Sequence, residues 1–411
     1  MTFPVFILGG AQTDFAKVWS RSGLDIADMM REVMTEALVD SKIEPRQVEA
    51  IHVGNAFAEL QRRQAHLGAV AIDVMPEFWG IPAMRHEAAC ASSSIAILAA
   101  MAEIQSGRHQ CILVVGAEEE KNTTGDIASE NQNSAAWQGR EDIDCRFMWP
   151  AAFGLMALEY ESRYGLDRKH LNRIAEINYA NARRNPLAQT RGWRLEPIKF
   201  TDDEIANPVI EAGTRRQDCA QITDGAAALI LASPEFAAAH SNRLGINIEA
   251  FARLDGWGHR NAGARLKPKF EMSRNSELLF PHMKQAIVDA WTRAGVKEIS
   301  MLDGIETHDC FTITEYLAID HFGLTRPGHA FEAVESGAIE RGGQLPFNPS
   351  GGLIGCGHPV GATGARLVLD SARQVTGRAG EMQVENAKRF GTLNIGGSCS
   401  TICSFVIASG T

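Results

Sequence analysis

Short apolar runs alternate along the chain with longer segments in which apolar residues recur every three or four positions. Residues 4–8, 48–53 and 111–116 are apolar runs of strand length, each ending at or beside glycine. Residues 24–39 and 94–105 carry apolar residues at helical spacing. Strands that alternate with helices predict a parallel sheet covered on both faces. The first part of the chain therefore predicts an α/β unit.

The pattern changes between residues 119 and 219. This stretch is polar, contains Trp137, Trp149 and Trp193, and has two helix candidates at 153–164 and 171–184. The strand pattern returns at residues 225–231. Long excursions within a compact domain are usually functional. We therefore expect an inserted loop domain over one face of the sheet.

The later part of the chain repeats the order of the earlier part. Residues 36–57 and 290–311 share the spacing of a helix end, a strand and a following loop. The helices predicted after Cys90 and after His358 both end in Gly-Arg and lead into a strand. We therefore predict two α/β copies packed face to face, with Cys90 and His358 at equivalent loop–helix junctions near the pseudo-twofold axis. The predicted domains are an N-terminal core (1–118 plus 220–256), the insertion (119–219) and a C-terminal core (257–411).

Composition narrows the class of function. The 411 residues are 45% hydrophobic and 22% charged, as in ordinary globular proteins, and the formal charge of −10 argues against nucleic acid or an anionic membrane as the main partner. No apolar run is long enough to span a bilayer. The eight cysteines lack Cys-x-x-Cys or Cys/His metal spacing, so we expect no metal. Without an export signal, we expect reduced thiols and a cytoplasmic protein.

The richest motif is the segment 348–366, which reads NPSGGLIGCGHPVGATGAR. A glycine loop ahead of a helix could bind an anion, but no Gly-Lys-Ser/Thr follows, which makes the phosphate-loop interpretation the weaker one. The glycines permit sharp bends around His358. We expect the loop to hold His358 beside a reactive group, as general base to Cys90.

Two cysteines are candidates for chemistry. Cys90 lies just before a predicted helix, where free N–H groups and the helix dipole stabilise a thiolate and Ser92, Ser93 and Ser94 offer capping hydroxyls. Alternatively, Cys90 is a small buried apolar side chain. The histidine at the equivalent position of the repeat, His358, favours the role of nucleophile for Cys90. Cys310 ends a predicted strand of the second copy, where α/β folds place ligands. Spacing alone leaves open whether Cys310 transfers protons or fills the core, and neighbouring His308 could donate to an oxyanion.

These motifs together resemble the thiolase superfamily from end to end. The resemblance lies in residues 87–94 around Cys90, in 222–228 (ITDGAAA), and in the Gly-His-Pro-Val-Gly-Ala-Thr-Gly segment around His358. It implies the five-layered α-β-α-β-α thiolase fold and acyl transfer through a thioester on Cys90, with coenzyme A held by the insertion as a substrate and no permanently bound cofactor. By the family pattern His358 activates Cys90 and lines one oxyanion hole. The N–H groups of Cys90 and Gly396 form the second.

One departure from the commoner thiolases is informative. They carry an acid/base cysteine where this chain has Asn394, and Asn-Glu-Ala-Phe where it has His-Asp-Cys-Phe at 308–311. This combination is similar to the sterol-carrier-protein-type thiolases, which implies that Cys310 takes the acid/base role and His308 replaces the asparagine. The rival thiols are Cys399, Cys403 and, more remotely, Cys356. The related ketosynthases use two histidines and would leave Cys310 unexplained.

We therefore predict a 3-ketoacyl-CoA thiolase or acetyl-CoA acetyltransferase, an acyl-CoA C-acyltransferase that catalyses Claisen condensation or its thiolytic reverse. The alternatives are an acyltransferase to an acceptor other than coenzyme A, and a non-thiolytic scaffold subunit. The family pattern also implies a homodimer or homotetramer, and some members need a small partner subunit.

Overall fold

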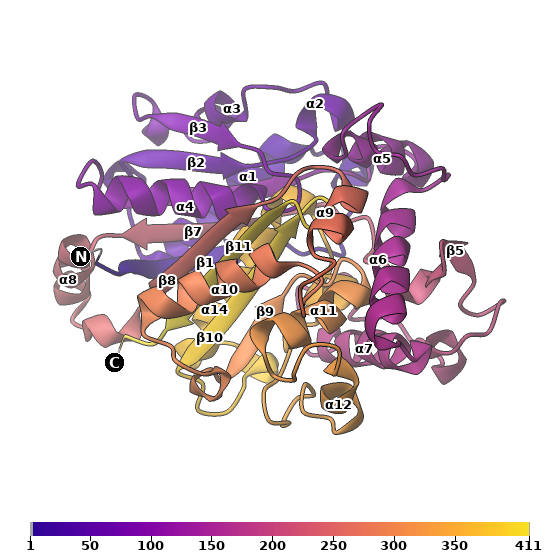
Figure 1. The fold of residues 1–411 in the computed structure, drawn as a ribbon. Coiled ribbons are helices and arrows are strands. Elements are labelled where there is room, and N and C mark those ends of the chain that lie inside the picture. The colour runs from indigo at the N-terminus through magenta and orange to yellow at the C-terminus, as the bar shows by residue number, and fades with distance from the viewer. Residues whose placement is uncertain (1–2, 411) are drawn as a thin grey trace.

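A computed structural model describes residues 3–410, and within them the strands form one nine-stranded sheet and one two-stranded sheet. The large sheet has the order β3-β2-β4-β7-β1-β8-β11-β10-β9 (Figure 1). Its strands are β1 (Val5–Gln12), β2 (Ala50–Gly54), β3 (Ala83–His86), β4 (Cys111–Glu118), β7 (Gly225–Ala232), β8 (Ala252–Asn261), β9 (Gly304–Thr307), β10 (Arg389–Gly396) and β11 (Thr401–Ala408). The small sheet pairs β5 (Val209–Glu211) with β6 (Thr214–Arg215).

The helices cover this sheet in layers. They are α1 (Ile26–Ser41), α2 (Ala58–Gln61), α3 (Leu67–Asp73), α4 (Ser92–Gln105), α5 (Gly125–Gln132), α6 (Met148–Tyr164), α7 (Arg168–Ala182), α8 (Pro234–Leu244), α9 (Leu266–Met272), α10 (Pro281–Ala294), α11 (Thr312–Phe322), α12 (Ala330–Glu335), α13 (Gly352–Cys356) and α14 (Thr363–Val375). Among residues 3–410, none of these helices has both the length and the apolar character needed to cross a bilayer.

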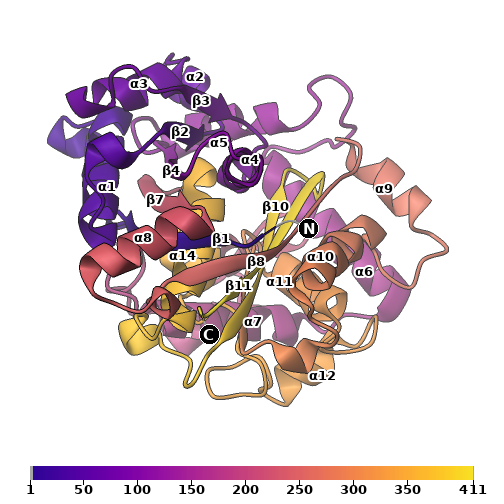
Figure 2. The same ribbon diagram turned by 90° about the vertical axis from the view of Figure 1, so that its left-hand side faces the viewer.

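Three apolar cores separate the layers. Helices α1, α3 and α8 bury one face of the β3-β2-β4-β7-β1 half of the sheet. Helices α4 and α14 lie between that half and the β8-β11-β10-β9 half, and share a core with both (Figure 2). Helices α10 and α11 cover the far face of the second half. The layers therefore follow the order α-β-α-β-α.

The same order of elements occurs in both halves. The first half runs β1-α1-β2, then β3-α4-β4, then β7, and the second runs β8-α10-β9, then α14-β10, then β11. The halves meet where β1 pairs with β8 over Val5, Phe6 and Ile7. Cys90 precedes α4 and His358 precedes α14, which are equivalent helices in the two halves.

The prediction of a parallel sheet is wrong in part, because the sheet is mixed. β2 pairs in parallel with β3 and β4, and β9 with β10, but β4, β7, β1, β8, β11 and β10 pair antiparallel in that order. The β10–β11 connection is a hairpin without a crossover helix, which requires antiparallel pairing. Both faces of the sheet are nevertheless buried, which explains the uniformly apolar strand sequences.

The first strand is longer than predicted. β1 continues through Gly9 and Gly10 to Gln12, whereas an end at the two glycines was expected. A Cβ on Gly9 would lie 2.7 Å from Asp40 Oδ2, and one on Gly10 would overlap the carbonyl oxygen of Ala228. The glycines therefore allow α1 and β7 to approach β1, and they do not end the strand.

The contact between β8 and α10 also depends on glycine. A Cβ on Gly258 would overlap the backbone carbonyl oxygen of Ala286, which cannot move without displacing α10. We expect Gly258→Ala to lower the free energy of unfolding by about 2 kcal/mol or more. Urea unfolding followed by circular dichroism measures this change. Gly192→Ala is the matched control, because nothing lies within 4 Å of its added Cβ. Equal stability of the two variants would contradict the packing described here.

Candidate active site

Cys90 lies in the short connection between β3 and α4, immediately before the first turn of the helix. The preceding residue, Ala89, has a φ of 50°, in the left-handed region that non-glycine residues rarely adopt. Ser92 stabilises this bend, because its Oγ accepts a hydrogen bond from Ala88 N (3.0 Å) and donates one to Ala89 O (2.6 Å). The bend therefore turns the Cys90 side chain toward the second half of the molecule.

The three serines after Cys90 do not cap α4, contrary to expectation. The N-cap residue is Ala91, which has no capping side chain. Ser93 Oγ instead accepts a hydrogen bond from Ala365 N of α14 (2.9 Å), and Ser94 Oγ donates to Asn394 Oδ1 of β10 (2.7 Å). The hydroxyls connect the two halves of the molecule because α4 and α14 begin side by side.

His358 is buried between α13 and α14. Its backbone N–H donates to Thr223 Oγ1 (2.9 Å), and its ring Nδ1 lies 2.7 Å from Thr363 Oγ1. The Thr363 hydroxyl donates its single proton to Pro359 O (3.1 Å), so it must accept from His358 Nδ1–H. The hydrogen-bond network thus assigns a lone pair to His358 Nε2, as a base requires.

His308 has the opposite tautomer. It directly follows β9, and its Nδ1 lies 3.1 Å from Asn394 Nδ2. Since Asn394 Oδ1 accepts from Ser94, its amide N–H₂ faces the imidazole, and His308 Nδ1 must accept. The proton of neutral His308 is therefore on Nε2. The site contains one imidazole that can accept a proton and one that can donate a hydrogen bond.

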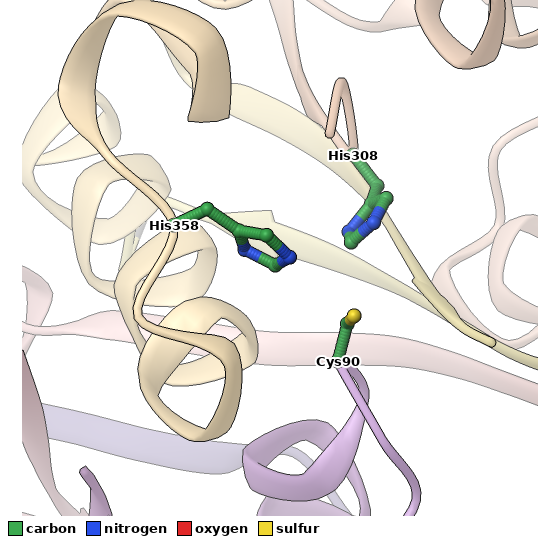
Figure 3. A group of neighbouring side chains, drawn as sticks. All are labelled: Cys90, His308 and His358. Atoms are coloured by element: carbon green, nitrogen blue, oxygen red, sulfur yellow. The ribbon is translucent and has the colours of Figure 1, made fainter. Parts of the chain in front are cut away.

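The structure brings Cys90, His308 and His358 together from three separate segments. One side-chain ligand atom of each residue lies within 4.8 Å of those of the other two (Figure 3). The two imidazole rings meet edge to face, with centroids 5.2 Å apart and planes at 87°. Cys90 and His358 open into a cavity of about 360 Å³ whose other walls are mainly apolar and aromatic: Phe57, Phe147, Trp149, Phe153, Ile210, Ile222, Phe311 and Val360.

Burial sets the protonation states of the site. It lowers the pKa of His358 to about 3, with a smaller contribution from the positive charge of Arg366. Burial also lowers the pKa of His308, and the neighbouring His358 and Arg366 lower it further. Burial raises the pKa of the Cys90 thiol to about 12, with a contribution from Glu120. Desolvation therefore opposes the stabilisation of a thiolate that the helix terminus is expected to provide. The resting pair is a neutral thiol and a neutral imidazole.

Cys310 lines the same cavity as Cys90, and its side chain is 6% exposed. Its backbone carbonyl accepts a hydrogen bond from Ala220 N (2.8 Å), which fixes the loop after His308. Burial raises the pKa of its thiol, and the nearby Cys90 and Asp309 raise it further. A third cysteine, Cys219, also lines the cavity, and it forms an isolated β-bridge with Phe311. The sequence did not single out this cysteine.

The rival thiols lie elsewhere. Cys399 contacts Met156 Sδ at 4.0 Å within the core of the second half. Cys403 lies in the middle core, and Cys356 is 3.4 Å from Asn185 Nδ2. None of the three is among the described residues that line the cavity. Geometry therefore favours Cys310 over its rivals for the acid/base role, which stays a prediction.

Gly396 ends β10, opposite Thr401, and has no room for a Cβ because one would overlap the carbonyl oxygen of Ala88. The next residue, Gly397, lines the cavity. The backbone N–H groups of Gly397 and of Cys90 itself lower the pKa of the Cys90 thiol, against the larger opposite effect of burial. Gly397 therefore lies in the cavity wall with Cys90, and Gly396 packs against the Cys90 loop. The sequence alone does not show which of these two adjacent glycines lines the cavity.

Sequence reasoning also missed the buried groups that support the histidines. Asp309 accepts hydrogen bonds from Leu353 N (2.5 Å), Ile354 N (3.2 Å) and Asn178 Nδ2 (3.0 Å), and so links the His308 loop to α13 and α7. The guanidinium of Arg366 lies 2.7 Å from Ser350 Oγ and 3.1 Å from Asp370 Oδ2. A signal was present, since a charged residue inside an apolar helix pattern is buried only when it is paired.

Cys90, His308 and His358 are also the residue types that bind zinc. A metal ligand must present a lone pair, and His308 Nε2 carries the proton in the tautomer that Asn394 and Ser94 impose. The cluster is therefore better suited to acid–base chemistry than to holding an ion.

Comparison with known proteins identifies the family. Two family models match the chain, "Thiolase, N-terminal domain" over residues 5–212 and "Thiolase C-terminal domain-like" over residues 264–409. The chain belongs to the thiolase family. This confirms the predicted thiolase fold and the predicted class of enzyme, an acyltransferase of the thiolase class.

Individual relatives cover nearly the whole chain. An acetyl-CoA acetyltransferase of Methanothermobacter thermautotrophicus is 31% identical over 402 residues, 97% of either chain. Sterol carrier protein 2 of Oryctolagus cuniculus is 28% identical over 93% of this chain and 68% of its own length. The solved structure of the Ltp2-ChsH2(DUF35) aldolase superposes with a TM-score of 0.76 at 17% identity, covering 99% of this chain and 98% of that one. The acetyl-CoA acetyltransferase of Syntrophomonas wolfei gives a TM-score of 0.69 at 16% identity over all of both chains.

The tautomer of His308 can be reversed by one substitution. In Asn394→Asp, the side chain becomes an acceptor, so His308 must donate from Nδ1 and its pKa rises because the carboxylate favours the imidazolium. Nitrogen-15 spectra of labelled histidine should show the wild-type His308 proton on Nε2 at neutral pH and on Nδ1 in the variant, with His308→Gln assigning the signal. Ser94→Ala, which leaves the amide in place, should not raise the pKa. A wild-type proton on Nδ1 would contradict the assignment.

Proposed function

We propose that this chain is a 3-ketoacyl-CoA thiolase or acetyl-CoA acetyltransferase that works through a thioester on Cys90. The observation that carries the proposal is the pair of complementary imidazoles beside Cys90, with His358 and a second thiol, Cys310, lining the same cavity as Cys90. Acyl transfer by this route needs a nucleophile, a base, an oxyanion donor and a proton donor. Each has a candidate side chain in the site.

In the cleavage direction His358 Nε2 takes the proton of Cys90 as its sulfur attacks the keto carbon of a 3-ketoacyl-CoA. The N–H groups of Gly397 and Cys90, which lower the pKa of that thiol, stabilise the oxyanion that forms next to the sulfur. The bond between the keto carbon and the α-carbon then breaks, which leaves an acyl-enzyme and the enolate of acetyl-CoA. His308 Nε2–H donates a hydrogen bond to the enolate oxygen.

Cys310 then gives its proton to the α-carbon of the enolate and releases acetyl-CoA. Its raised pKa keeps the thiol protonated, as a donor must be. The Cys310 thiolate takes the thiol proton of free coenzyme A, whose sulfur attacks the acyl-enzyme. His358 returns its proton to Cys90 as the shortened acyl-CoA leaves. Condensation follows the same steps in reverse.

The insertion supports acyl-CoA as the substrate, with coenzyme A a substrate rather than a bound cofactor. Phe147, Trp149 and Phe153 of the insertion form one wall of the cavity, so a substrate reaches Cys90 beneath it. Among the described lining residues the exposed Arg216 is the single cation and the exposed Asp126 the single acid. A mainly apolar cavity with an exposed arginine suits a thioester arm that ends in phosphates. This is the basis for assigning residues 119–219 to the coenzyme A side.

Transfer to an acceptor other than coenzyme A is the second candidate function, favoured by the aromatic wall that the insertion builds. The two candidate functions differ in the molecule that accepts the acyl group from Cys90. The scaffold alternative predicts no acyl-enzyme at all.

Association and location are further expectations. Strand β3 is an edge of the large sheet, Met84 on it is 37% exposed and nearby Trp79 is 71% exposed, so pairing of two β3 strands would cover this edge in a homodimer or homotetramer. All eight cysteines are free, as a reducing compartment such as the cytoplasm requires. A need for a small partner subunit stays a prediction, as does the expectation of neither nucleic acid nor membrane as partner.

Replacement of Cys90 tests the nucleophile. Cys90→Ser should abolish acyl-enzyme formation from acetyl-CoA, because a serine hydroxyl beside an imidazole of pKa about 3 is a far weaker nucleophile. Intact-protein mass spectrometry after incubation with acetyl-CoA detects the acetyl group. Cys219→Ser, a change of another cavity thiol, should keep the mass shift. An acetyl adduct that persists on Cys90→Ser would exclude this nucleophile.

Replacement of Cys310 tests the proton donor. Cys310→Ala should still acylate at Cys90, while condensation and thiolysis fall by about 10²-fold or more, since a general acid contributes on that scale. Loss of enolate absorbance from 3-ketoacyl-CoA substrates measures thiolysis. Cys399→Ala is the matched control and should keep both activities. If Cys399→Ala loses thiolysis and Cys310→Ala does not, the second thiol is misassigned.

A further inference from the structure

Lys269 of α9 is a buried cation with neutral partners. Its side chain is 5% exposed. Its Nζ lies within hydrogen-bond distance of four neutral oxygens, Ser398 O (2.5 Å), Ser398 Oγ (2.9 Å), Ser400 Oγ (2.9 Å) and Ala264 O (3.3 Å). Burying a charge among neutral oxygens is unfavourable compared with leaving it in water. Such a group is a candidate for a role other than stability.

The acceptors of Lys269 belong to the turn that joins β10 to β11. This turn contains two left-handed residues, Gly397 at φ 62° and Cys399 at φ 58°. The left-handed conformation of Cys399, a residue with a Cβ, costs roughly 1 kcal/mol, so contacts from outside must hold it. His282 Nε2 donates to Cys399 O (2.8 Å), and Lys269 holds the residues on either side.

The turn carries an N–H of the candidate active site. Gly397 lines the cavity together with Cys90, and its N–H lowers the pKa of the Cys90 thiol. Lys269 is not among the described residues that line this cavity. It contacts Ser398, the residue next to Gly397, so its influence on the sulfur passes through the turn.

We propose that Lys269 is a positioning residue for acyl transfer: its ammonium group holds the β10–β11 turn so that the Gly397 N–H points at the Cys90 sulfur, and its charge strengthens that oxyanion site. The inference rests on the proposed function of Cys90. It adds a residue that touches neither the substrate nor Cys90.

The charge of Lys269 gives the proposal a pH dependence. Burial lowers its pKa to about 8, while Cys399 and Glu141 raise it in part. Of the groups packed around it, Glu141 comes from the insertion, Cys399 from the turn, and His282 from α10 has its own pKa lowered mainly by burial. As the pH rises through about 8, the ammonium loses one N–H and its charge. The acylation rate should therefore fall on the alkaline side.

Single-turnover acylation of Cys90 by acetyl-CoA, followed by mass from about pH 6 to 9.5, tests this. We expect a wild-type rate that falls above about pH 8. Lys269→Met should acylate about 10- to 100-fold more slowly at pH 7, without the alkaline fall, because an oxyanion donor is worth that much or more. Lys269→Arg keeps the charge and should recover part of the rate with no fall up to pH 9.5. Lys284→Met, which changes another partly buried lysine whose Nζ donates to Phe322 O (3.3 Å), should behave as wild type.

Alkylation of Cys90 by iodoacetamide separates this inference from the proposed function, because it needs no acyl-CoA. Lys269→Met should slow alkylation about 10-fold, since a misdirected Gly397 N–H no longer stabilises the thiolate. If acetyl-CoA does not acylate the wild type but alkylation slows in the variant, only the proposed function fails. A wild-type acylation rate that does not fall by pH 9.5, or equal alkylation rates, would overturn the role of Lys269. The wild-type profile decides the matter if Lys269→Met does not fold.

Discussion

The close approach of the amino-terminal ends of α4 and α14 is the contact on which the site depends. A Cβ on Gly364 would lie 2.5 Å from Ser94 N, and one on Gly361 would lie 2.7 Å from Ala117 O. On the other side, a Cβ on Gly54 would lie 2.5 Å from the Ser93 backbone. Backbone can pack this closely against backbone only where there is no side chain. The glycines of the 348–366 segment therefore let the two halves meet, which places Cys90 and His358 within reach of each other.

This contact also determines the chemistry, because it removes water. Two imidazoles with lowered pKa values stay neutral, and each takes its tautomer from a hydroxyl or amide partner and not from a carboxylate. A carboxylate partner would raise the pKa of an imidazole and favour its protonated form, which has no lone pair to accept the Cys90 proton. The neutral partners, Thr363 for His358 and Asn394 with Ser94 for His308, orient each ring and leave it neutral. The burial that makes the thiol hard to ionise thus makes His358 necessary.

Much of this arrangement could be predicted from the sequence. The helical and strand periods of the sequence predict most of the elements, and the internal repeat alone predicts that Cys90 and His358 lie at equivalent helix junctions. The antiparallel course of β7 and β11 could not be predicted, because the periodicity of a strand carries no direction. The serines after Cys90 were misinterpreted because a capping hydroxyl and one that reaches another helix have the same local sequence. The raised pKa of Cys90 results from burial in the folded structure, which the local sequence does not predict.

The order of the strands has a consequence for where a proton donor can lie. β9 and β10 are parallel neighbours, and His308 N donates to Leu393 O across them, so the residues after β9 and at the end of β10 lie at the same edge of the sheet. A thiol at position 310 and one at position 394 would therefore approach Cys90 from adjacent strands. On the proposed role of Cys310, the same proton transfer would be open to a thiol on the neighbouring strand. The position of the proton donor is therefore not tied to one strand of the sheet.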